Sequence, residues 1–481
     1  MSVAKNFFYN SAITVSNYIV GFLVFPYISR VLGVSNIGIV GFVDNVIAYF
    51  LLFSVLGLHT VGIREIASQK SKEGTTIVFF QLLSFLIVTI SAALIVFLVV
   101  TQCTSIFSEY RKIFLIGVCK LMFTPLMIEW LYAGKQDFRY ISIRTIIIRV
   151  LYLISIFIFV RHKDDVVIYY VLTSSCVLLN SIVNIYTSRK YINYRFFKFD
   201  PFVYAKPIMK LGFFAIITSL YSSFNVICLG KVSTLFQVGL YCTAIKLYDI
   251  IMSIFRAYTS VVMPQMSQYA ANNDNKSFHD LSNKSFEVLF SFSIPLSIIT
   301  FILSPMIIQI IAGDDFLGAA MPMRIIMPIL IIAGINQCVG VQVLMPLKKD
   351  NVLLVTASIA AFVGVVSNLL LDAKLGAIGA AITILLSELT GCIGGLYYSR
   401  SHHLISIPVK SFFKYFITSI PYVFIYFLLR LLPLGDVWAS IVILLFFCFY
   451  FSYQQIVLCK NPVIISYIKK LSNGRRTDSQ S

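Results

Sequence analysis

The sequence predicts an all-α protein that crosses a membrane many times. Three observations lead to this prediction: 59% of the 481 residues are hydrophobic, only 12% are charged, and the mean hydropathy is +0.89. A soluble protein of this length needs more polar surface to cover its core, whereas lipid tails solvate apolar side chains directly. Apolar runs of about 20 residues recur along the chain, and each is long enough to cross a bilayer as a helix. Closed β-barrels show short alternating segments instead.

About 14 spanning helices are expected from the lengths of these apolar runs. In chain order, the expected spans are 10–30, 38–58, 77–100, 112–133, 145–160, 166–187, 211–230, 237–260, 286–312, 322–345, 351–371, 376–398, 412–432 and 437–457. The connections between them are short, so no loop is expected to fold as a separate domain.

Positive charge in the loops predicts the orientation. With the N-terminus in the cytoplasm, the cytoplasmic loops carry about 25 Lys and Arg residues and the opposite loops about 9. An even number of spans then places both termini in the cytoplasm. The first residues lead into an apolar run without a cleavage site, so an uncleaved first helix is expected. The net charge of +18 requires no nucleic acid, because basic loops and anionic lipid headgroups account for it.

Several kinds of chemistry have no motif in the sequence. The nine cysteines are spread singly, and no C-x-x-C pair or metal spacing is present. The five histidines lie in or beside loops and form no metal motif. A phosphate-binding G-x-x-x-x-G-K-[ST] loop and a nucleophile elbow are both missing. We therefore expect neither an enzyme nor an ATPase, and no cofactor or metal.

A weak internal repeat relates the two halves of the chain. Its members share a Leu-Gly pair at the end of one span and a glycine near the start of the next: Leu32, Gly33 and Gly38 in the first half, and Leu229, Gly230 and Gly239 in the second. Transporters are often built from such halves, with the substrate site between them. Chance is the alternative explanation, because Leu-Gly is a common dipeptide.

The eighth expected span carries a polar stripe. Lys246, Asp249, Ser253, Arg256 and Ser260 follow spacings of three and four residues, which places them on one helical face. A charge at the bilayer centre costs about 2.5–3.5 kcal/mol or more, so it usually faces a cavity or a partner. The stripe is therefore interpreted as the wall of a wet, cationic groove. The alternative is an internal Lys246–Asp249 pair, with Arg256 reaching the cytoplasmic headgroups.

Other spans carry isolated polar residues. In the first span, Asn17 lies near Pro26, which can bend the helix. Asp44, Arg149 and Glu388 lie in spans 2, 5 and 12. Either carboxyl group could change protonation during transport, and a satisfied, hydrogen-bonded carboxylate is the alternative. Three further charged residues, Arg30, Lys120 and Glu129, lie near span ends and are expected to act as interfacial anchors.

Four groups of motifs resemble those of Wzx-type polysaccharide flippases. They are Pro26-Tyr27-Ile28-Ser29-Arg30-Val31-Leu32-Gly33 with Gly38; Gly62-Ile63-Arg64-Glu65-Ile66-Ala67; Glu129-Trp130-Leu131-Tyr132-Ala133-Gly134 with Asp137-Phe138-Arg139-Tyr140-Ile141 and Ile143-Arg144; and Leu229-Gly230 with Val238-Gly239-Leu240-Tyr241, Ala244, Lys246 and Pro264. Together they cover about the first 270 residues. Each motif is short, but their order and spacing make the set fairly specific.

The resemblance implies a fold shared with multidrug-and-toxin extruders and lipid II flippases. Two six-helix lobes would enclose a central cavity, with the N-terminal lobe over 1–195, the C-terminal lobe over 196–400, and two further helices with a cytoplasmic tail over 401–481. The implied substrate is an undecaprenyl-diphosphate-linked oligosaccharide, moved to the outer face of a bacterial inner membrane for O-antigen, capsule or lipopolysaccharide synthesis. Membrane lipids, a polysaccharide polymerase and a chain-length regulator are the expected partners. One departure is Asn225, where many relatives carry Asp.

These observations combine into one hypothesis, in which a cationic chamber between the lobes shelters the phosphate-bearing headgroup during alternating access. The candidate substrate-binding residues are Asn17, Arg149, Asn225, Lys246, Ser253 and Arg256, and the candidate ion-coupling residues are Asp44, Asp249 and Glu388. A cation-coupled drug exporter with the same fold is the alternative, but it predicts a smaller and more acidic cavity.

Overall fold

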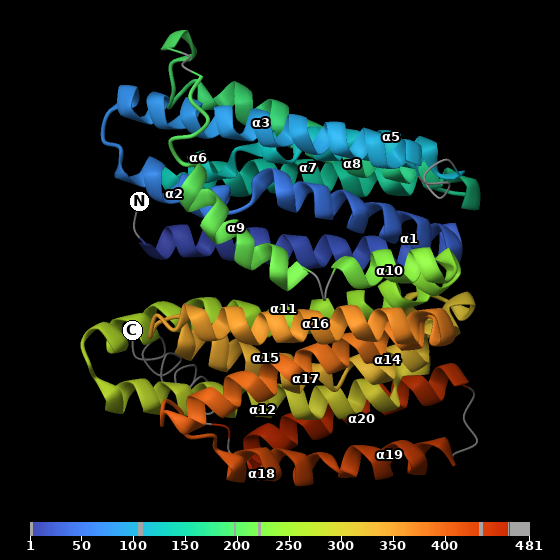
Figure 1. Ribbon diagram of the computed structural model, residues 1–481. Coiled ribbons are helices and arrows are strands. Elements are labelled where there is room, and N and C mark those ends of the chain that lie inside the picture. Colours follow the sequence, from blue (N-terminus) through green and yellow to red (C-terminus); the bar gives the residue numbers. More distant parts are fainter. Residues whose placement is uncertain are drawn as a thin grey trace, which may run out of the picture. The chain divides into compact units, whose positions relative to one another are not determined.

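The computed structural model describes residues 3–103, 109–196, 199–219, 223–431, 436–459 and 461, and all regular structure in these ranges is helical (Figure 1). The chain divides into two compact units. Unit 1 comprises Met1–Cys242, Ile311–Phe316 and Gly364–Ala380, and unit 2 comprises Thr243–Ile310, Leu317–Val363 and Ala381–Ser481. The lobe boundaries that the sequence suggested, at residues 195 and 400, stay a prediction.

Unit 1 is built mainly from the first half of the chain. Its helices are α1 (Val3–Val55), α2 (Leu58–Ser68), α3 (Lys72–Cys103), α5 (Arg111–Phe123), α6 (Glu129–Gly134), α7 (Phe138–Phe159), α8 (Val166–Ser188), α9 (Ala205–Ser219), α10 (Ser223–Val232) and the start of α11 (Leu235–Ala271). Short 3₁₀ turns, η1 (Pro125–Met127), η2 (Lys163–Asp165) and η3 (Tyr194–Phe196), connect some of them. The end of α16 (Asp350–Leu375) and the first turn of α17 (Ala377–Ser401) also belong to unit 1.

Unit 2 contains the rest of α11, α16 and α17. Its other elements are α12 (Asn275–Ile302), α13 (Ser304–Ile311), η4 (Asp314–Ala319), α14 (Ala320–Ile326), α15 (Ile329–Asn336), the π-helix η5 (Gln337–Leu344), α18 (Val409–Ser419), α19 (Pro421–Arg430), α20 (Asp436–Tyr453) and the π-helix η6 (Gln454–Leu458). The last residue of α13 and the first residues of η4 belong to unit 1.

Ten helices of the described ranges are long and apolar enough to span a membrane, or eleven if a bent pair at Asp314–Leu344 forms one span. The protein is therefore a multi-pass helical membrane protein, as predicted. The count is lower than the number of expected spans because expected spans 1 and 2 lie in the single element α1. The described parts of expected span 7 lie in α9 and α10, and the described part of expected span 14 is Val442–Leu458; each of these segments is too short to be counted.

Glycines of the two Leu-Gly motifs allow helices of unit 1 to approach closely. Gly33 adopts φ 78° and ψ 172°, which breaks the helical path within α1, and this φ strongly favours glycine. A Cβ atom at Gly38 would overlap the carbonyl oxygen of Leu235, and one at Gly239 would overlap the carbonyl oxygen of Val34. Gly38 and Gly239, the glycines that follow the two Leu-Gly pairs, therefore face each other where α1 meets α11.

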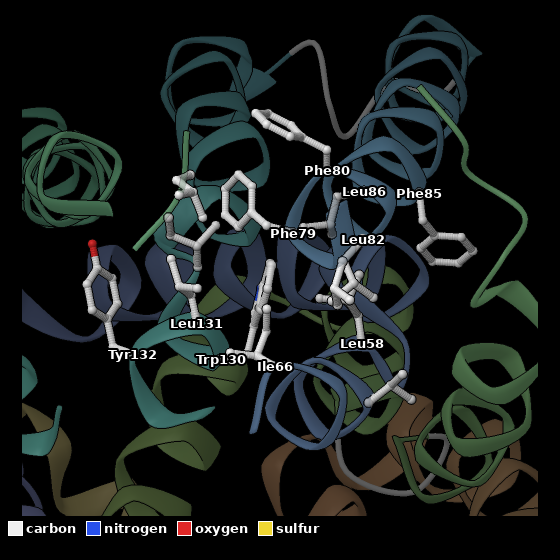
Figure 2. Close-up of a cluster of buried hydrophobic side chains, with 14 of the residues drawn as sticks. Leu58, Ile66, Phe79, Phe80, Leu82, Phe85, Leu86, Trp130, Leu131 and Tyr132 are labelled. Carbon is white, nitrogen blue, oxygen red and sulfur yellow. The ribbon is translucent and has the colours of Figure 1, made fainter. Parts of the chain in front are cut away.

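The motifs of α2 and α6 form part of a hydrophobic core in unit 1 (Figure 2). Leu58 and Ile66 of α2, Phe79 of α3 and Trp130 of α6 are buried together, and the Phe79 and Trp130 rings lie 5.5 Å apart. A Cβ atom at Gly62 would lie 2.9 Å from the Trp130 ring. Packing therefore explains why glycine and tryptophan occur together in these motifs.

Candidate functional site

A cavity of about 670 Å³ lies inside unit 1, among α1, α2, α6, α7 and α8. We call it the unit-1 cavity. Its volume falls in the range of about 300–1,000 Å³ that is usual for small-molecule sites. The polar or ionisable residues in its wall are His59, Glu129, Thr145, Arg149, Tyr152, Thr173, Cys176 and Asn180. The remaining wall is apolar and includes Ile13, Val20, Ile141 and Ile148.

Arg149, a predicted substrate-binding residue, lines this cavity from the middle of α7. Its Nη1 donates to the carbonyl oxygen of Ile13, with 3.2 Å between the two atoms. Among the described residues, no carboxylate forms an ion pair with Arg149. The structure therefore places one guanidinium group, with most of its donors uncommitted, at the wall of a cavity inside the membrane domain.

Glu129 also lines the cavity, and Arg144, which is not part of the cavity wall, forms an ion pair with it. Arg144 Nη2 lies 2.6 Å from Glu129 Oε1, and the two side chains are 4% and 35% exposed. The same nitrogen donates to Thr145 Oγ1 at 2.9 Å. The Nε and Nη1 atoms of Arg144 are buried without a hydrogen-bond partner among the described residues. The sequence suggested an interfacial anchor at Glu129, whereas the structure places it in a largely buried ion pair.

Asp44, a predicted ion-coupling residue, is held by two partners in unit 1. Lys120 Nζ lies 2.7 Å from Asp44 Oδ1, and the hydroxyl of Tyr170 donates to the same oxygen at 2.8 Å. The Lys120 ammonium also lies 4.0 Å from the centre of the Tyr170 ring. Asp44 therefore has the satisfied environment of the alternative explanation, and Lys120 is its partner rather than an interfacial anchor.

A group of buried polar residues lies where α10, α11, α16 and α17 meet within unit 1. Asn225, the third predicted substrate-binding residue in this unit, is fully buried. Its Nδ2 donates to the hydroxyl of Tyr241 and to the carbonyl oxygen of Ala380, both at 3.0 Å. Because Asn225 is enclosed by protein, it is not open to a bulky substrate in this conformation.

The same group contains a carboxyl group that sequence reasoning missed. Asn368 and Asp372 lie one turn apart on α16, both are fully buried, and their four polar side-chain atoms have no hydrogen-bond partner among the described residues. The thiol of Cys228, a weak hydrogen-bond donor, lies beside Asp372. Burying such groups without partners costs several kcal/mol, so a proton or a small cation is expected to accompany the carboxyl group. We call Asn225, Asn368 and Asp372 the Asp372 cluster.

The polar stripe of the eighth expected span lies on α11 in unit 2. Lys246 and Arg256 are exposed and Asp249 is partly exposed, and Arg256 Nη2 lies 3.1 Å from Asp249 Oδ1. The alternative Lys246–Asp249 pair is therefore not formed. Ser253 departs from the expected stripe: it is 3% exposed, because its short side chain turns back to donate to the carbonyl oxygen of Ile250.

Glu388, the third predicted ion-coupling residue, lies on α17 in unit 2. Nδ2 of Asn336 donates to Glu388 Oε2 at 2.7 Å and to the Glu388 carbonyl oxygen at 3.1 Å. Asn336 ends α15 immediately before the π-helix η5, and such segments are frequent at functional sites. The carboxylate has a partner here, as the alternative explanation requires.

Two further expectations from the sequence concern Asn17 and metal ions. The side chain of Asn17 lies outside the described residues, so its role stays a prediction. No group of three or more His, Cys, Asp or Glu residues suited to a metal ion occurs in the described part of the chain.

Comparisons with known proteins agree with this architecture. Residues 3–270 match the family model of the polysaccharide biosynthesis proteins. A protein of Escherichia coli (strain K12) named for O-antigen transport is 27% identical over 406 residues, which cover 81% of this chain and 94% of that protein. A protein of Haloferax volcanii named for flipping in low-salt glycan biosynthesis is 23% identical over 201 residues, or 41% of this chain and 42% of that protein.

Among solved structures, the lipid II flippase MurJ in its inward closed conformation has the same fold. The TM-score is 0.73 at 19% sequence identity, and the match covers 95% of this chain and 100% of that one. The predicted membrane fold is therefore confirmed. The related proteins are named as transporters or flippases rather than enzymes.

Proposed function

The chain belongs to the polysaccharide biosynthesis protein family, and on this premise we propose that it is a flippase for a lipid-linked glycan. The names of the E. coli and H. volcanii relatives support this class of substrate. In finer detail, the substrate is an undecaprenyl-diphosphate-linked oligosaccharide. It moves by alternating access from the cytoplasmic to the outer face of a bacterial inner membrane, and both termini of the protein lie in the cytoplasm.

The physical problem for such a protein is the headgroup. A glycan diphosphate is charged and heavily hydrated, so moving it through hydrocarbon would cost far more than burying one polar group. The lipid tail can remain in the bilayer, whereas the sugars require a polar path inside the protein. A flippase therefore needs hydrogen-bonding groups and positive charge at membrane depth.

The observation that carries the proposal is the unit-1 cavity. It combines Arg149 with neutral hydrogen-bonding residues such as Thr173 and Asn180 inside a bundle of apolar helices. Intramembrane polar groups at a cavity are costly and usually functional. Hydroxyl and amide groups suit sugars, and the guanidinium suits an anion.

The remaining candidate contacts stay predictions within this proposal. Lys246 and Arg256 lie exposed on one helix of unit 2, where they can meet the diphosphate. Asn225 and Ser253 are buried, so they would reach the substrate only after a conformational change. The chamber expected around these groups remains part of the proposal.

Ion coupling is assigned here to Asp372. Among the earlier candidates, Asp44 and Asp249 are in ion pairs and Glu388 is bonded to Asn336. Asp372 forms no ion pair in the described part of the chain, and the thiol beside it, that of Cys228, is a weak hydrogen-bond donor. Such a carboxyl group is stabilised by a proton or a monovalent cation. Movement of that proton or cation down its gradient across the membrane would supply the free energy for transport.

A strain that lacks the protein tests the proposal. We expect undecaprenyl-linked oligosaccharide to accumulate on the cytoplasmic face, and the wild-type gene to restore surface polymer. Lys246→Glu should fail to restore polymer while the protein remains in the membrane, because the reversed charge repels the diphosphate. Absence of the lipid-linked intermediate would contradict the substrate class, and normal polymer in the Lys246→Glu strain would contradict the role of that cation.

A further inference from the structure

The charge balance of the unit-1 cavity restricts what it can hold. Among the described residues, the charged side chains that bear on the cavity are Arg149 and Glu129 in the wall, Arg144, which pairs with Glu129, and Lys120, which acts on Cys176 but is itself paired with Asp44. Glu129 and Arg144 are also the charged groups near enough to act electrostatically on Arg149. Since Arg144 and Glu129 neutralise each other at 2.6 Å, one positive charge, that of Arg149, is left over. His59, which is also in the wall, is exposed.

A single surplus charge favours a ligand that carries one negative charge. A diphosphate carries at least two, and Glu129 in the same wall would repel the second. A carboxylate has one charge and fits the planar guanidinium through two parallel hydrogen bonds. Arg149 has donors for these bonds, because only its contact with the carbonyl oxygen of Ile13 is formed among the described residues.

The rest of the wall suits a sugar ring. Thr145 and Thr173 contribute hydroxyl groups, and Asn180 contributes an amide. The Oδ1 atom of Asn180 is buried and has no hydrogen-bond partner among the described residues, so a hydroxyl group that reaches it would satisfy it. Tyr152 adds a ring and a hydroxyl group to the same wall.

We propose that the unit-1 cavity is a subsite for an acidic sugar residue of the transported glycan, with its carboxylate on Arg149 and its hydroxyl groups on Asn180 and the threonines. This inference rests on the proposed function and specifies its substrate class: the glycan carries a sugar with a single negative charge. The diphosphate of the lipid carrier binds elsewhere.

The reactivity of a native cysteine, Cys176, can be used to test this subsite. Cys176 lies in the cavity wall, and its thiol is close enough to Arg149 to be affected by that charge. In a variant in which the other eight of the nine cysteines are serine, membranes are treated with two methanethiosulfonate reagents, one with a sulfonate and one with a trimethylammonium group. The measured quantity is the ratio of their reaction rates at Cys176, in which changes of thiol reactivity cancel.

We expect the anionic reagent to be favoured, and Arg149→Gln to lower the rate ratio at least about fivefold. Arg149→Lys keeps the charge and should keep the ratio within about twofold, which separates loss of charge from loss of folding. Arg139→Gln is the matched control, since Arg139 is exposed at the start of the same helix and outside the cavity wall. An unchanged ratio in Arg149→Gln would overturn the anion subsite.

Protection of Cys176 then distinguishes the sources of negative charge. Millimolar glucuronate should slow labelling, whereas glucose and inorganic phosphate should not. Equal protection by phosphate would overturn the assignment to a carboxylate, equal protection by glucose would overturn charge recognition, and no protection by glucuronate would overturn the subsite. These outcomes are independent of whether the strain lacking the protein accumulates a lipid-linked intermediate, so the two proposals fail separately.

Discussion

Unequal burial of Glu129 and Arg144 predicts an unequal response to mutation. The Arg144 side chain is 4% exposed and the Glu129 side chain 35%. In Glu129→Gln, the buried guanidinium loses its counter-charge and cannot reach water. In Arg144→Met, the carboxylate that remains can be hydrated through its exposed edge. Removal of the less buried partner should therefore destabilise the protein more.

The magnitude follows from the cost of breaking buried ion pairs, about 3–5 kcal/mol. Partial exposure of Glu129 reduces this to about 2–3 kcal/mol for Glu129→Gln. We expect about 1 kcal/mol for Arg144→Met, because that change also removes the unpartnered Nε and Nη1 atoms. The double variant should resemble Arg144→Met, since no uncompensated charge remains buried.

Thermal unfolding of the detergent-purified protein, followed by size-exclusion chromatography, is a suitable assay. At about 2–4 °C per kcal/mol, Glu129→Gln should lower Tm by roughly 4–12 °C and Arg144→Met by roughly 2–4 °C. An Arg144→Met variant less stable than Glu129→Gln, or a double variant showing the sum of the two losses, would refute the reasoning.

Three further predictions concern other parts of the chain. Gly38→Ala should lower Tm and protein yield, because its Cβ would overlap a carbonyl oxygen of α11, whereas Gly21→Ala in the same helix has no atom within 4 Å and should be tolerated. Hydrogen bonds from the Ser277 side chain and backbone lower the pKa of Asp274. Its stabilisation of the start of α12 is present above the ordinary aspartate pKa of about 4 and is lost as the pH falls through the lowered value. The protection factor of the Ser277 amide, which is the intrinsic exchange rate divided by the measured rate, should therefore fall in this pH range, and Asp274→Ala should abolish that fall. Asp372→Asn should abolish transport without lowering Tm, because the amide has nearly the same shape as the buried carboxyl group but binds neither an exchangeable proton nor a cation; normal transport would contradict the coupling role.

Hydropathy and motif order were sufficient to predict a multi-pass helical membrane protein, because the bilayer demands long apolar helices whatever the tertiary contacts. The helix count was less predictable. Glycine at position 33 interrupts α1 so briefly that two expected spans form one element. The motif around Trp130 was recognised from the sequence, but its role in core packing required the three-dimensional contacts of α2, α3 and α6.

Partner choice was the main limit for the site. Helical periodicity placed Lys246, Asp249 and Arg256 on one face, but it did not show that Asp249 pairs with Arg256 rather than with Lys246. Lys120 and Glu129 were assigned to the interface from their distance to span ends, yet each meets a partner from another helix. Such pairs lie far apart in the sequence, so no local pattern reveals them.

Asp372 was missed for a related reason. The expected span ended at residue 371, so the carboxyl group was treated as part of a loop, whereas α16 continues to Leu375. The spacing of Asn368 and Asp372, four residues apart, was the available signal, since it places an amide and a carboxyl group on one helical face.

Transport by the purified protein in proteoliposomes is the most direct measurement of the central claim. An undecaprenyl-diphosphate oligosaccharide is placed in the inner leaflet, and its arrival outside is followed with an impermeant sugar-modifying enzyme. The account predicts that the glycan becomes accessible in the presence of the wild-type protein and not with Lys246→Glu. Equal accessibility with and without the protein would contradict it.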